Sequence, residues 1–277
     1  MSFKETLVEA GFSEGEAERL VNDDWFAQRN SNKSAEEIRK EIKTIASTYL
    51  TTETDIRKAV LSHPQFAGLD HQRVLKGIKD VYNCTQEQAS KAVLSHPQFA
   101  DLDHQRVLKG IKDVYNCTQE QASKAVLSHH SFAGYDHQRV LKGIKDAYGC
   151  TQEQASKAVL SFPQFAGLDH QRVLRQLGRI GKIVDMDRNE VKRRILERPV
   201  LAGYSAKRYL AAIDIGRELR KEGINSDKIL SAWPSYYAKS PYVPDTNRLS
   251  ITKAAKRGIN GEPPLMTAMR NKLRAAG

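Results

Sequence analysis

The chain has 277 residues, 28% of them charged, and a formal net charge of +11 at pH 7. No run approaches the roughly 18 apolar residues of a membrane span, and the first residues lack the basic and then apolar order of a secretory signal. The composition therefore argues against a membrane-spanning or secreted protein. We expect a soluble protein of the cytoplasm, a nucleoid or an organellar matrix.

The positive charge is unevenly distributed along the chain. Residues 1–57 carry 8 Lys/Arg and 12 Asp/Glu, residues 58–174 carry 14 and 11, and residues 175–277 carry 22 and 10. The basic excess thus belongs to the C-terminal third. Such an asymmetry predicts a polyanionic partner, and nucleic acid is favoured over a membrane surface because no basic stretch has a broad apolar face.

Residues 1–51 are expected to form a divergent N-terminal capping repeat. Ser13-Glu-Gly-Glu16 has the form of a capping box, in which the serine and glutamate side chains each bond the backbone N–H of the other residue. A helix is predicted to follow, because Ala17, Leu20 and Val21 are spaced at i, i+3 and i+4 and would form one apolar face.

Residues 52–184 are predicted to contain four near-identical repeats of 33 residues. The segments 58–90 and 91–123 differ only at Gly68 and Asp101, a third copy spans 124–156, and a fourth departs from the pattern after Leu174. A fixed period in this range indicates stacked supersecondary units, each of which buries its apolar face only against its neighbours.

Each repeat is interpreted as a pair of antiparallel helices. In the second copy a capping box at Thr85-Gln-Glu-Gln88 begins the first helix, and Pro97 ends it because proline excludes the preceding residue from the α region. Asp103 caps the second helix, and Asn116 closes it in the left-handed conformation that asparagine tolerates. The inward stripes are expected to consist of Ala89, Ala92 and Val93 in the first helix and of Val107, Leu108, Ile111 and Val114 in the second.

Divergent repeats are predicted over residues 185–245 and a basic tail over residues 246–277. Glu197-Arg-Pro-Val-Leu201 aligns with Ser95-His-Pro-Gln-Phe99 of the second copy, and residues 232–236 resemble the start of a further unit. The expected fold is therefore all-α, a right-handed-type α-solenoid of about six stacked helix pairs with a basic C-terminal extension.

Neither a catalytic site nor a metal site is expected. The sequence has no glycine-rich phosphate loop and no Gly-x-Ser-x-Gly elbow, and the recurring His96 and His104 lack partners at familiar ligand spacings. The cysteines precede successive helix caps and are expected to act as small apolar residues; they are Cys84, Cys117 and Cys150. We predict no enzymatic activity and no cofactor.

Stacking would align equivalent cations into rows on the outer face of the second helices. Neighbouring helix axes lie about 8–10 Å apart, so such rows suit a phosphate backbone. The alternative is an ordinary solvated surface. The candidate backbone-contacting residues are Arg73, Lys76, Lys79, Arg106, Lys109, Lys112, Arg139, Lys142, Lys145, Arg172 and Arg175, with Lys253, Lys256 and Arg257 in the tail.

Differences between the copies gather at the turn between the two helices. The residue that ends the first helix has a planar side chain in every unit, and such side chains can stack on a base or enter a groove. Ordinary loop variability is the alternative explanation. The candidate base-contacting residues are His63, His96, His129, Phe162, Arg198 and Trp233.

The run from Val191 to Ser205 resembles repeats of the mitochondrial transcription termination factor (mTERF) family, in which a proline ends the first helix, an apolar pair follows and a leucine-bearing helix closes near glycine. The resemblance covers roughly residues 52–236. It implies a curved helical array that binds duplex nucleic acid through basic side chains. The further contact candidates that it implies are Arg193, Arg194, Lys207 and Arg208.

The copies are also similar to TAL-effector repeats in length and in a Thr-Gln-Glu-Gln run followed by a helix ending in Ser-His, although that family's paired glycines are missing. Both resemblances imply an α-solenoid on nucleic acid. We predict nucleic-acid binding, with duplex DNA favoured over RNA, as in a regulator or terminator of transcription. Two alternatives stay open: a tetratricopeptide-like scaffold for a protein partner, and a nucleic-acid-processing enzyme with a C-terminal site.

Overall fold

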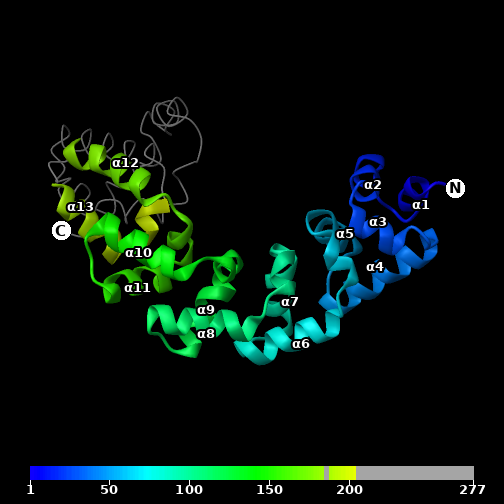
Figure 1. Ribbon diagram of the computed structural model, residues 1–277, viewed down its shortest axis with the longest axis horizontal. Helices are drawn as coiled ribbons and strands as arrows, with labels where there is room; N and C mark the ends of the chain where they lie inside the picture. The colour runs from blue at the N-terminus through cyan, green and yellow to red at the C-terminus, as the bar shows by residue number, and fades with distance from the viewer. Residues whose placement is uncertain (184–186, 204–277) are drawn as a thin grey trace, which may run out of the picture. The chain divides into compact units, whose positions relative to one another are not determined.

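The computed structural model describes residues 1–183 and 187–203, and over these residues it contains only helices and their connections (Figure 1). The all-α class expected from the sequence is thereby confirmed. The chain divides into two compact units, Met1–Leu141 and Lys142–Gly277. The division falls inside helix α10 (His137–Tyr148).

The N-terminal region of the first unit contains four helices, where the sequence predicted a single divergent repeat. They are α1 (Phe3–Glu9), α2 (Glu14–Val21), α3 (Asp24–Asn30) and α4 (Ala35–Tyr49). Ser13 forms the predicted capping box with Glu16, and Ser2 and Ser34 begin α1 and α4 in the same way. Helix α4 packs against α5, the first helix of the first pair, so this region covers the N-terminal end of the repeats.

The repeats form helix pairs whose two members are joined by a short 3-10 helix. The pairs are α5 (Glu53–Ser62) with α6 (His71–Tyr82), α7 (Gln86–Ser95) with α8 (His104–Tyr115), α9 (Gln119–Ser128) with α10, and α11 (Gln152–Ser161) with α12 (His170–Ile183). The 3-10 helices span Pro64–Gly68, Pro97–Asp101, His130–Gly134 and Pro163–Gly167.

The predicted caps begin and end these helices. The Thr85 hydroxyl accepts from the N–H of Gln88 (3.2 Å), and the Gln88 amide oxygen accepts from the N–H of Thr85 (2.9 Å). The Asp103 carboxylate accepts from the N–H of Arg106 (3.0 Å). Asn116 has a φ of 48° and closes α8 in the left-handed conformation. Each cap satisfies a helix-end group that would otherwise lack a partner.

Within the first unit the helices form two layers. In one layer α6 contacts both α4 and α8, and in the other α7 contacts both α5 and α9 (Figure 1). Val93, Phe99 and Ile111 are fully buried between them. The amide of Gln86 donates to the carbonyl of Thr48 (2.9 Å) near the end of α4, and this bond ties α7 to α4, from which it is separated along the chain by α5 and α6.

A row of tyrosine and histidine pairs links each repeat to the next. The Tyr82 hydroxyl lies 3.2 Å from Nδ1 of His104, and the His104 ring centroid lies 4.6 Å from that of Phe99. The same hydrogen bond recurs between Tyr49 and His71, Tyr115 and His137, and Tyr148 and His170. Burial is the main cause that lowers the pKa of all four histidines to about 4.

In the second unit α13 (Arg188–Glu197) is followed by a 3-10 helix at Pro199–Gly203, the order found in the copies and expected from the alignment. Asp187 caps α13, and Val191 and Ile195 are fully buried. No helix in residues 1–183 and 187–203 combines the length and the hydropathy of a bilayer span.

Candidate functional site

Five cations form what we call the cationic face of the first unit: Arg73, Lys76, Arg106, Lys109 and Arg139. Arg73 and Lys76 are three residues apart on α6, Arg106 and Lys109 are three apart on α8, and Arg139 is in the first turn of α10. Side chains three apart on a helix lie on one side of it. All five are exposed.

The apolar stripe of each second helix fixes the direction of these side chains. On α8, Leu108 and Ile111 are buried, whereas Arg106 and Lys109 are exposed. Lys112 is half-buried, like Lys79 and Lys145 at the equivalent positions. Lys79 donates to the amide oxygen of Gln86 (3.4 Å). The third predicted row is thus turned toward the neighbouring first helix and is less available than the other two.

The side chains of the cationic face form no ion pair among the described residues. The ion pairs found there involve other side chains, chiefly in α1–α5 and α13. Asp70 and Asp103 are occupied as helix caps. Arginine and lysine groups left without carboxylate partners are the donors that a phosphate oxygen needs.

The second unit carries further cations at equivalent positions. Lys142, Arg172 and Arg175 are exposed, on α10 and α12. They likewise take part in no ion pair of the described residues.

The cations of α13 are in a different state. Arg193 donates to Glu190 (2.7 and 2.8 Å) and also bonds Glu197, while Arg194 donates to Glu190 (2.7 Å). These bonds lower the pKa of the Glu190 carboxyl to about 2. Arg193 and Arg194, which the mTERF resemblance suggested as contacts, therefore have intramolecular partners already.

The predicted base-contacting residues lie at the ends of the first helices. His63, His96, His129 and Phe162 end α5, α7, α9 and α11, and all four are half-buried. Arg198 ends α13 and is exposed.

Neighbouring side chains engage several of these turn residues. His63 Nε2 bonds the Asp101 carboxylate of the next turn. The Tyr135 hydroxyl lies 3.5 Å from Nε2 of His129. Phe162 packs near Gly203, where a Cβ would lie 3.6 Å from the ring. His96 makes no side-chain hydrogen bond among the described residues. Burial lowers the pKa of His129, and the charge of His96 lowers it further.

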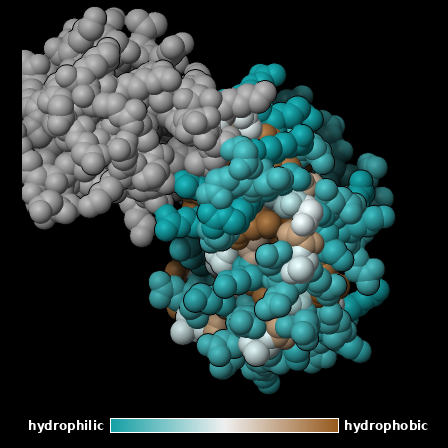
Figure 2. Space-filling view, turned by 90° about the vertical axis from the view of Figure 1, so that its left-hand side faces the viewer, coloured by the Kyte–Doolittle hydropathy of each residue, from teal (hydrophilic) through white to brown (hydrophobic). Residues whose placement is uncertain are grey.

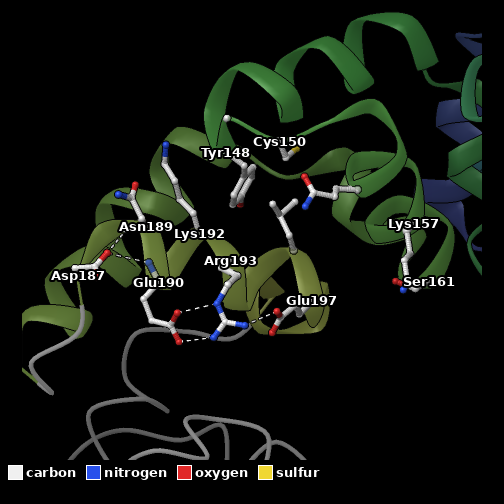
Figure 3. Close-up of a pocket in the computed structure, with 13 residues that line it drawn as sticks. Tyr148, Cys150, Lys157, Ser161, Asp187, Asn189, Glu190, Lys192, Arg193 and Glu197 are labelled. Atoms are coloured by element: carbon white, nitrogen blue, oxygen red, sulfur yellow. Dashed lines mark hydrogen bonds and ion pairs between the residues drawn. The ribbon is translucent and has the colours of Figure 1, made fainter.

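A groove of about 800 Å³ lies in the second unit between the end of α10, α11 and α13 (Figure 3). Its lining includes Tyr148, Cys150, Lys157 and Lys192. Lys192 of α13 occupies the position that a buried serine has in the first helices of the copies. Figure 3 shows Arg193 between the two glutamates at its edge. The groove thus combines both charge signs, and its glutamates are already paired.

The cysteines are half-buried free thiols, and burial raises the pKa of all three. In the described part of the chain no group of three or more His, Cys, Asp or Glu side chains is placed to hold a metal ion. The face seen in Figure 2 is largely hydrophilic, with hydrophobic residues in small patches. That face therefore offers polar rather than broad apolar contacts.

Several predicted contacts lie outside the described residues: Lys207, Arg208, Trp233, Lys253, Lys256 and Arg257. No protein-family model matches the chain, and a search of curated proteins finds no significant match. The case for a function therefore depends on the residues themselves.

Proposed function

We propose that the chain binds nucleic acid without catalysing a reaction, with duplex DNA as the favoured ligand and the cationic face as the main contact surface. The supporting observation is that Arg73, Arg106 and Arg139 occupy equivalent positions and are exposed without carboxylate partners in the described residues. Regular rows of this kind suit a ligand whose negative charges are themselves regular.

The charge of each repeat is divided between its two layers in a way that supports this surface. On α7 the exposed Glu87 and Lys91 balance each other, whereas on α8 the three cations Arg106, Lys109 and Lys112 outnumber the two acids, Asp113 and the N-cap Asp103. The positive excess is therefore on the second-helix layer. The mTERF and TAL-effector resemblances lead to the same ligand, and a role in transcription is part of the proposal.

Binding should be measured by fluorescence anisotropy of the full chain with duplex DNA, single-stranded DNA and RNA of random sequence, at several salt concentrations. We expect binding at low salt and a log K that falls linearly with log salt, by about 0.9 for each phosphate neutralised on duplex DNA. Absence of binding to all three at low salt would refute the proposal. Protein partners recovered after nuclease treatment would then favour the scaffold alternative.

A further inference from the structure

We infer that recognition is independent of base sequence: the repeats of the first unit read the phosphate backbone, and the differences between their turns serve contacts within the protein. This inference rests on the proposed function and narrows its ligand to the regular, sequence-invariant part of a duplex.

The cationic face presents the same side chains in each copy and so cannot encode a base sequence. Its residues are the same in each copy, since arginine occupies positions 73, 106 and 139 and lysine occupies positions 76 and 109. Identical side chains in identical environments make identical contacts. Bases vary along a duplex, whereas phosphates do not, so the ligand group that matches an invariant row is the phosphate.

A base code would have to be carried by the turn between the two helices, where the copies differ. The first two copies differ only at Gly68 and Asp101, and the Asp101 carboxylate is bound to His63 of the preceding turn. His63 is one of the candidate base-contacting residues. The His63 ring nitrogen Nε2 is therefore already bonded within the protein, and its partner is the one residue by which the second copy differs from the first.

In the third copy, two of the residues that differ from the other copies also contact side chains within the protein. His130 replaces the proline of the other turns, and its Nδ1 lies 2.7 Å from the hydroxyl of Ser95 in the preceding repeat. Tyr135 replaces a leucine, and its hydroxyl lies 3.5 Å from Nε2 of His129. The substituted side chains thus contact neighbouring turn residues, and their polar atoms are directed to partners within the chain.

The test compares the full chain with two variants on three duplexes of equal length: A/T only, G/C only and mixed. The first variant, Asp101→Gly/His130→Pro/Tyr135→Leu, returns the turns to the common sequence. The second, Arg106→Ala/Lys109→Ala, removes two cations of one repeat. A single read base pair is worth about 1–3 kcal/mol, or roughly 5- to 150-fold in Kd, so specific readout is easily detected.

For the unmodified chain we expect Kd values that agree within about threefold across the duplexes. The turn variant should bind with the same Kd values, because no base contact is lost. Its melting temperature should fall slightly, because the turn contacts within the protein are removed. The second variant should weaken all three complexes by the same factor, since phosphate contacts are shared by every sequence. Circular dichroism confirms that each variant is folded.

Differences above about fivefold between duplexes would overturn the inference, and so would a preference that the turn variant alters. Such results would leave the proposed function standing, because the chain would still bind DNA. Failure to bind any duplex at low salt would instead refute the proposed function itself. Selection from a random oligonucleotide pool provides an independent readout, in which we expect no enriched motif; a motif with evenly spaced preferred bases would contradict the inference.

Discussion

The first helices of the copies and helix α13 occupy equivalent positions, yet they differ in their packing and in how their charged side chains are paired. Helix α7 packs through small residues, with Ala92 and Ser90 buried, and carries a single lysine. Helix α13 has four basic residues, yet two of them are bonded to its own glutamates. On α8, which has fewer basic residues than α13, Arg106 and Lys109 are both exposed and form no ion pair among the described residues. Thus the local density of Lys and Arg is a poor guide to where a polyanion can bind.

The largest effect should come from the aromatic core of the copies. Phe99 is completely buried between Tyr82 and His104, so Phe99→Ala should cost about 3–5 kcal/mol in unfolding free energy. Val200, at a turn position next to α13, is 37% exposed, and Val200→Ala should change stability by less than about 0.5 kcal/mol. Urea unfolding measures both, and equal losses would contradict this account of the core.

The next test distinguishes free from paired arginines. Arg73→Ala/Arg106→Ala/Arg139→Ala should reduce the slope of log K against log salt by about 2.7, because each lost phosphate contact removes about 0.9. Arg193→Ala is the matched control, and we expect the slope to change little because Arg193 is bonded to Glu190 and Glu197. A reduction of about 0.9 for Arg193→Ala, the same loss per arginine as in the triple variant, would show that intramolecular pairing does not decide which arginines bind.

Acid should destabilise the tyrosine and histidine row. The pKa of His104 is lowered to about 4 in the folded chain, against 6.5 for an unperturbed imidazole, chiefly by burial. Since the unfolded chain takes up protons first, stability is unaffected above pH 6.5 and falls as the pH decreases from 6.5 toward 4. His104→Gln should make the loss between pH 7 and pH 5 smaller, as measured by urea unfolding. His96→Gln, outside the row, is the control; the same reduction there would argue against this origin.

The smallest effect concerns the ends of the second helices. Asn116 closes α8 at a φ of 48°, and Gly149 occupies the same place after α10 at a φ of 65° with open space around it. Gly149→Asn should therefore be nearly neutral, whereas Gly149→Val should cost roughly 1–2 kcal/mol in backbone strain. Thermal melting of the two variants checks this, and equal melting temperatures would show that the left-handed position imposes no constraint.

The helix boundaries and their caps were predictable because they depend on interactions within a few residues. Thr85, Asp103 and Asn116 play their predicted parts, and a proline follows α5, α7, α11 and α13, whereas His130 occupies that position after α9. The extra short helices at the N-terminus, α1 and α3, were not predicted, because they lack the periodic pattern of the copies. Cation exposure on α8 also followed from the helical period, which places Leu108 and Ile111 inward.

The sequence by itself determined the helix pairs, their order and the position of each repeated cation, because caps, proline and apolar spacing act over one or two turns of chain. Only the tertiary structure decided which polar groups remain free. His104 meets Tyr82 from 22 residues earlier, and Asp101 meets His63 from 38 residues earlier. Such partners depend on how repeats stack and side chains turn, which a pattern along the chain does not specify.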